Sequence, residues 1–165
     1  MNIWTIGIDP GAKGAISLLD RHGELLECED MPSPDGTVSG ASLADLIDNW
    51  MQPRGPLGMV TAIVEKVGAM PKQGVASTFK FGTNYGVALG VLGALRIRTV
   101  LVTPAQWKRE MRLSRDKGAS RAAADRRWPS DADLFRRVKD DGRAEAALIA
   151  AWWLDGHGRR QDGAR

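Results

Sequence analysis

Two short apolar runs, each ending on a carboxylate, constrain the fold of this chain most. The first covers residues 3–8 and leads to Asp9, and the second covers residues 59–64 and leads to Glu65. Runs of this length, bounded by turn-forming residues, are typical of strands buried inside a sheet. If the two strands are neighbours, their carboxylates meet at one edge of that sheet. The simpler alternatives are a turn-forming role for Asp9 within Asp-Pro-Gly and a local ion pair between Glu65 and Lys66.

The rest of the chain alternates further strand and helix patterns. Strands are expected at residues 15–19, 25–28 and 98–102, and glycine-bearing turns join the first two to the opening strand. Helices are expected from Ser42 to about Trp50, over residues 75–95, from Pro104 through Trp107 and Met111, within the basic segment 112–127, and from near Gly142 onward. We therefore expect an α/β fold, a sheet with helices on its faces, in a single domain over residues 1–157 followed by a polar tail at 158–165.

The composition indicates a compact domain with a polyanionic partner. The 165 residues are 43% hydrophobic and 26% charged, which is enough apolar content to bury a core. Although the formal net charge is only +3, the basic residues concentrate between Lys108 and Arg137. Such asymmetry favours a polyanion as partner, and an ordinary solvated surface is the alternative.

The cysteine and histidine content narrows the metal chemistry and the compartment. Cys28 is the only cysteine, so we expect neither a disulfide framework nor a cysteine-based metal site, and we expect a cytoplasmic location. His22 and His157 lie too far apart to indicate a zinc site. The sequence shows neither a signal peptide nor a run of about 18 apolar residues, so we expect no membrane partner.

A third acid, Glu145, opens an almost entirely apolar helix near the C-terminus. Asp141 lies four positions earlier and shares its helical face, whereas Asp140 would be rotated away, so Asp141 is the expected partner of Glu145. The alternative for Asp141 is a favourable contact with the positive end of the helix dipole.

Converging carboxylates predict a site for divalent cations. Three or four carboxylates without paired His or Arg would repel each other unless a cation lay among them. Oxygen ligands alone favour Mg²⁺ or Mn²⁺, and two such ions about 4 Å apart support in-line hydrolysis of a phosphodiester. The predicted metal ligands are Asp9, Glu65, Asp141 and Glu145.

Four stretches of the chain resemble the RuvC-type Holliday junction resolvases, in particular the small phage-type members, which have an RNase H-like fold. They are IGIDPGAKGAI at 6–16, IVEKVGAMPKQGVASTFKFG at 63–82, VTPAQWKREM at 102–111 and DDGRAEAALIAAWWL at 140–154. The resemblance implies a mixed five-stranded sheet and catalytic acids at Asp9, Glu65 and Glu145. The family's fourth acid commonly falls three residues before the last one, where this chain has Gly142, and Asp141 is the nearest substitute.

The resemblance also implies contacts to DNA. Lys108 and Lys117 are similar to family lysines that contact or polarise backbone phosphates, and we include Lys117 among the catalytic residues. Sequence-independent phosphate contacts are expected from Lys72, Lys80, Arg112, Arg115 and Arg121. The junction-opening aromatic of the family is absent shortly after Glu65, and Phe79, Phe81 or Tyr85 are candidate substitutes, although helical spacing also suits a core role for the two phenylalanines.

The family works as a homodimer because a four-way junction offers two symmetric strands to nick. Gly82, Gly86 and Gly90 recur at intervals of four within the expected long helix. They indicate either a part of that dimer interface or close packing of the helix on its own sheet.

The sequence therefore predicts a structure-selective endonuclease in a bacterial or phage-infected cell. It would nick four-way and other branched DNA junctions with two Mg²⁺ or Mn²⁺ ions per active site and leave 5′-phosphates. Two other readings stay open: a junction-binding protein without catalysis, because the fourth acid is imperfect, and an actin-like or kinase-like ATP-binding module, because such proteins also open on an acid followed by a glycine hairpin.

Overall fold

The computed structural model describes residues 4–66, 68, 74–116 and 118–156. Its sheet contains the strands β1 (Trp4–Asp9), β2 (Ala15–Asp20), β3 (Leu25–Asp30), β4 (Val60–Glu65) and β5 (Arg98–Val102), in the order β3-β2-β1-β4-β5. The first three strands form an antiparallel meander, whereas β1 pairs with β4 and β4 with β5 in parallel. The predicted mixed five-stranded sheet is confirmed, and Asp9 and Glu65 are themselves the last residues of β1 and β4.

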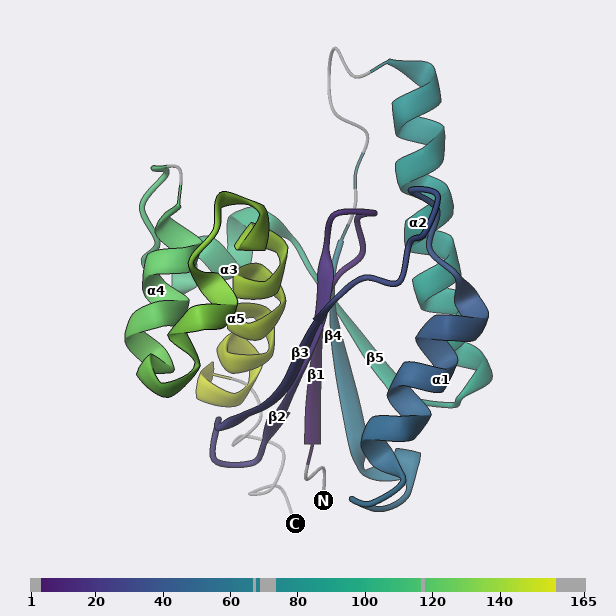
Figure 1. Ribbon diagram of the computed structural model, residues 1–165, viewed down its shortest axis with the longest axis horizontal. Coiled ribbons are helices and arrows are strands. Elements are labelled where there is room, and N and C mark those ends of the chain that lie inside the picture. The colour runs from purple at the N-terminus through teal and green to yellow at the C-terminus, as the bar shows by residue number, and fades with distance from the viewer. Residues whose placement is uncertain (1–3, 67, 69–73, 117, 157–165) are drawn as a thin grey trace.

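The helices form a layer on each face of this sheet (Figure 1). They are α1 (Gly40–Met51), α2 (Val75–Ala94), α3 (Pro104–Glu110), α4 (Ala119–Arg127) and α5 (Asp141–Gly156), with short 3₁₀ turns η1 (Leu57–Met59), η2 (Pro129–Phe135) and η3 (Val138–Asp140). Helices α1 and α2 cover one face, and α3, α4 and α5 cover the other. No helix within the described ranges is both long and apolar enough to cross a bilayer.

The start of α1 differs from the sequence prediction. Ser42 was the expected N-cap, but α1 begins at Gly40, and Ser39 is the cap. The Ser39 backbone is extended, and its hydroxyl accepts a hydrogen bond from the backbone N–H of Ser42. The prediction was wrong because two serines stand three residues apart and either suits a cap by composition.

Close packing of α5 on the sheet brings distant segments together. A Cβ atom at Gly7 in β1 would lie 1.9 Å from the backbone oxygen of Ala146 in α5. This part of the helix therefore sits directly on the backbone of the central strand. One turn earlier in α5, Gly142 lies against the turn between β1 and β2, where an added Cβ atom would meet the backbone of Lys13 and Gly14. These two contacts place the first turns of α5 over the end of β1.

Candidate active site

Three acids from distant segments meet at one edge of the sheet. Parallel pairing of β1 with β4, which matches Ile8 to Val64, puts Asp9 and Glu65 at the ends of adjacent strands. The packing of α5 on the sheet brings Glu145 to the same edge, where it lines the same cleft as Asp9. The predicted convergence of these three side chains therefore follows from the topology.

The pKa values of Asp9 and Glu65 are raised mainly by burial and partly by neighbouring carboxylates. Burial is the main cause that raises the pKa of Asp9 to about 6, and the nearby charge of Glu145 acts in the same direction. Burial likewise raises the pKa of Glu65 to about 7, with further contributions from Asp9 and Glu145. A bound cation would relieve this repulsion.

Helices α3 and α4 supply hydrogen-bond donors to the acids. The indole Nε1 of Trp107 donates to Glu65 Oε1 at 2.8 Å. Lys108 Nζ donates to Glu145 Oε1 at 2.6 Å, and the Ser120 hydroxyl donates to the same oxygen at 3.1 Å. Lys108 was expected to contact DNA, whereas no local sequence pattern indicates the contacts of Trp107 and Ser120 with the acids.

The carboxylates at this edge of the sheet are the type of ligand that a hard divalent cation prefers. The acids provide only oxygen ligands, and the recorded hydrogen bonds engage Oδ1 of Asp9 and Oε1 of Glu65 and Glu145. Within the described ranges, no group of three His, Cys, Asp or Glu side chains stands ready to hold an ion. Lys108 pairs with Glu145 Oε1 instead, so a cation at this edge would compete with the Lys108 ammonium for Glu145.

The two neighbouring acids before Gly142 have different surroundings. The Asp140 side chain is 1% exposed, and its carboxylate accepts hydrogen bonds from the backbone and guanidinium of Arg137. Hydrogen bonding to Arg137 holds the pKa of Asp140 below its usual range. Asp141 instead lines the cleft with Asp9 and Glu145, and it pairs with Arg121 Nε at 2.6 Å. Of these two acids, Asp141 is therefore the one that lines the cleft.

Introducing an acid at position 142 is expected to damage the fold rather than improve the site. The Cβ atom of Gly142→Asp would lie 2.6 Å from the Lys13 carbonyl oxygen and 2.9 Å from Gly14 Cα. Overpacking against backbone costs about 1–3 kcal/mol or more, so we expect a lower free energy of unfolding and no gain in divalent-ion affinity. Urea unfolding and Mn²⁺ titration of the variant measure the two quantities. Unchanged stability with tighter Mn²⁺ binding would contradict this expectation.

The cleft that these acids line has a volume of about 1,070 Å³ and lies between the hairpin turn and helices α3 and α4; we call it the basic cleft after its five basic lining residues, although Asp9, Asp116, Asp141 and Glu145 also line it. Its basic lining residues are Lys13, Lys108, Arg109, Arg112 and Arg115. Lys13, which no sequence pattern indicates as a DNA contact, is exposed in the turn between β1 and β2. The predicted contacts Lys72 and Lys117 lie outside the described residues. Arg121 is nearby, with its guanidinium directed to Asp141 and to the backbone oxygen of Arg136.

A second cleft, of about 980 Å³, lies on the α2 side of Asp9 and is also lined by Lys13, Lys80 and Phe81. The Phe81 ring lies against the backbone of Gly11 in the hairpin. Phe79, whose exposed fraction is 77%, does not line this cleft, and the core interpretation of its side chain is wrong. Tyr85 packs partly buried against the core between the sheet and α1–α2.

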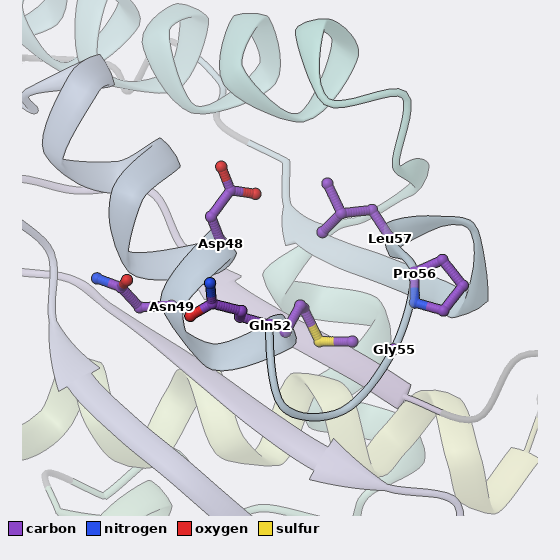
Figure 2. Close-up of a pocket in the computed structure, with 7 residues that line it drawn as sticks. Asp48, Asn49, Gln52, Gly55, Pro56 and Leu57 are labelled. Carbon is purple, nitrogen blue, oxygen red and sulfur yellow. The ribbon is translucent and has the colours of Figure 1, made fainter.

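A smaller cavity, of about 370 Å³, lies at the other end of the sheet (Figure 2). It is formed where α1 ends and the chain turns toward the start of β4. Asp48 is the one acid that lines it. The full length of β4 separates this cavity from Glu65, so it is not part of the acidic site.

The fold is similar to solved structures of Thermus thermophilus RuvC. A structure described as T. thermophilus RuvC in complex with a Holliday junction substrate has a TM-score of 0.60 and 15% sequence identity, covering 94% of this chain and 96% of that chain. A further T. thermophilus RuvC structure has a TM-score of 0.54 and 17% identity, covering 92% of this chain and 95% of that chain. No protein-family model and no curated protein sequence matches the chain. The likeness shows a RuvC fold of the RNase H-like type.

Proposed function

We propose that this chain, whose fold is that of RuvC, is a structure-selective endonuclease that nicks four-way and other branched DNA junctions. The observation that carries the proposal is the convergence of Asp9, Glu65 and Glu145 beside a basic cleft. The Holliday junction bound to the structurally similar T. thermophilus RuvC supports the choice of substrate.

The proposed reaction is phosphodiester hydrolysis that leaves 5′-phosphates, carried out in the cytoplasm. Two Mg²⁺ or Mn²⁺ ions, when bound, would supply activation of water and stabilisation of the leaving oxygen. Asp9 and Glu65 would hold them from the ends of β1 and β4, and Asp141 and Glu145 from α5. Lys108 pairs with Glu145 in the structure, and with Glu145 on a cation its ammonium would be available to contact a phosphate oxygen of the substrate.

The basic cleft would hold the DNA backbone on the α3–α4 side of the acids. Its lysine and arginine side chains would neutralise phosphates, which makes binding salt-dependent without selecting a base sequence. Lys80, together with the predicted Lys72 and Lys117, would extend these contacts. Phe81 lines the second cleft beside Asp9 and is the aromatic best placed to stack on a base near the scissile phosphate.

Substitution of Arg112 tests the proposed phosphate contacts and separates an effect on DNA binding from an effect on folding. Its φ is +55°, a left-handed conformation that a glycine adopts without strain. We therefore expect Arg112→Gly to keep or raise stability, by up to about 1 kcal/mol, while junction binding weakens and the slope of log affinity against log salt falls by about 1. Fluorescence anisotropy with a labelled four-way junction measures both quantities across a salt series.

Arg96→Gly is the matched control for this experiment. Arg96 has the same φ of +55°, but it precedes β5, lies at the end of the sheet away from the acids and does not line the basic cleft. It should show the same stability effect with unchanged binding. Equal junction affinity for Arg112→Gly and wild type would contradict the role given to Arg112.

We also propose that the chain acts as a homodimer through the outer face of α2. Gly82, Gly86 and Gly90 are exposed, and a Cβ at each would meet no atom within 4 Å, so the alternative of close packing on the chain's own sheet is wrong. Val75 and Phe79 are exposed at matching helical spacing. This leaves an apolar strip free for a second copy.

Gly86→Glu is expected to separate a dimer while favouring the helix. Replacing an exposed helical glycine stabilises a monomer by roughly 0.5–1 kcal/mol, but a buried charge at the interface would oppose association. Sedimentation velocity should show a dimer for wild type and a monomer for the variant. A wild-type monomer at tens of micromolar would refute the proposed interface.

A junction-binding protein without catalysis is the second candidate. It is favoured by Gly142 at the position of the family's fourth acid and by the ion pair of Asp141 with Arg121. Incubation of four-way, three-way and linear DNA side by side with Mg²⁺, Mn²⁺ or Ca²⁺ separates the two candidates. The nuclease proposal expects Mg²⁺- or Mn²⁺-dependent nicks in branched DNA only, whereas tight junction binding without nicks supports the second candidate.

A further inference from the structure

Trp107 has a buried ring and one polar atom, and that atom is directed at an acid of the site. The side chain is 0% exposed and packs within the core between the sheet and helices α3 to α5. A phenylalanine or leucine would also fill apolar space, but neither provides an N–H group. The indole N–H lies 2.8 Å from Glu65 Oε1, which is a good hydrogen bond to a carboxylate.

This hydrogen bond fixes one oxygen of Glu65. A glutamate at the end of a strand can adopt several rotamers, and a rigid donor on one carboxylate oxygen restricts the orientation of the other. The recorded hydrogen bond to the Glu65 carboxylate engages Oε1, so a cation would be held through Oε2. Partners of this kind orient metal ligands in many sites, and their loss commonly weakens metal affinity 10- to 100-fold.

The next residue of α3 reinforces the arrangement. Lys108 Nζ lies 5.2 Å from the centre of the Trp107 ring and 2.6 Å from Glu145 Oε1. Two consecutive residues of one short helix therefore contact the carboxylates of β4 and α5. Thr103 caps this helix and Pro104 begins it, so both hydrogen-bond donors belong to a helix with a fixed N-terminal end.

We infer that Trp107 is a positioning residue of the cation site, whose indole N–H orients the Glu65 carboxylate for a divalent ion. The inference rests on the proposed metal site and goes beyond it, because Trp107 itself contacts neither cation nor DNA. It predicts that the donor atom, and not the bulk of the ring, determines the affinity for the ion.

Three variants separate the donor from the packing. Trp107→Phe keeps most of the ring volume and loses the N–H, whereas Trp107→His keeps an N–H at the matching ring position and loses volume. Trp152→Phe is the matched control, because Trp152 Nε1 donates to Glu110 Oε2 on the same helix, also at 2.8 Å, and Glu110 does not line the cleft. Direct Mn²⁺ titration, by calorimetry or electron paramagnetic resonance, measures binding without DNA or activity.

We expect the dissociation constant for Mn²⁺ to rise about 10-fold in Trp107→Phe and less than about 3-fold in Trp107→His and Trp152→Phe. Thermal unfolding should show the opposite order at position 107, with Trp107→His the less stable because it leaves a cavity. If Trp107→His does not fold, 3-benzothienylalanine at position 107 takes its place, because it replaces only the N–H of the indole by sulfur. The inference then requires this variant to lose as much Mn²⁺ affinity as Trp107→Phe.

Two results would overturn the inference. Wild-type Mn²⁺ affinity in Trp107→Phe would exclude a role of the N–H, and equal losses in Trp107→Phe and in a folded Trp107→His would assign the effect to packing. Wild-type protein that binds no Mn²⁺ would instead refute the metal site itself. Mn²⁺ binding by the wild type therefore tests the proposed metal site, and the difference between the Trp107 variants tests the role of the N–H.

Discussion

Asp9→Asn is expected to reduce Mg²⁺-dependent cleavage of a synthetic four-way junction by about 10³-fold or more. Loss of a group that stabilises charge at the reacting centre has effects on this scale. The change keeps the shape of the side chain and an oxygen that accepts the hydrogen bond from Gly11 N–H, so the hairpin should fold unchanged. Single-turnover cleavage of a labelled junction measures the rate, and anisotropy in Ca²⁺ measures binding, which should be retained.

Asp20→Asn is the matched control for this result. Asp20 also ends a strand, but register with Trp4 puts it at the opposite end of β1 from Asp9. It accepts backbone hydrogen bonds from His22 and Glu24, which an asparagine oxygen can also accept. Its cleavage rate should equal that of wild type. Near wild-type cleavage by Asp9→Asn would remove the basis of the nuclease proposal.

Glu65→Gln is expected to stabilise the metal-free protein while it abolishes cleavage. The pKa of Glu65 is raised from 4.5 to about 7, so the folded state holds this proton more tightly than the unfolded chain. Its contribution to stability therefore falls as pH rises from about 4.5 to 7, and the loss is complete above pH 7. Glutamine carries no charge and still accepts the hydrogen bond from Trp107, so it avoids this loss.

The expected gain at pH 8 is about 2–3 kcal/mol, or roughly 5–10 °C in Tm, in buffer with a chelator. It should shrink toward zero below about pH 4, where the wild-type carboxyl is protonated in both the folded and the unfolded states. Calorimetric melting of both proteins at the two pH values measures the difference. A variant that is no more stable than wild type at pH 8 would show that Glu65 is not held in a repulsive, buried environment.

The strands and their acids could be predicted because they depend on local patterns. The apolar runs before Asp9 and Glu65 are long enough to identify central strands, and residues 98–102 match β5 in full. Once the two strands lie parallel, the position of their last side chains follows. The burial of α5 could also be predicted, since its sequence is apolar nearly all round.

The contacts among the side chains of the site could not be predicted in the same way. Trp107 reaches Glu65 across 42 positions and Ser120 reaches Glu145 across 25, and no sequence pattern encodes such distances. Asp140 and Asp141 differ in the structure because Arg137 holds the first and Arg121 the second. The reason for Gly142 also appears only when α5 lies against the hairpin turn, where a side chain would meet backbone.

The central claim is that a divalent ion binds among Asp9, Glu65 and Glu145, and anomalous diffraction tests it most directly. Crystals of the wild-type protein soaked in millimolar Mn²⁺ above pH 7 should show an anomalous peak bounded by these three carboxylates, with Lys108 moved away from Glu145. Data of equal quality with no peak between them, and with Lys108 still paired to Glu145, would contradict the account.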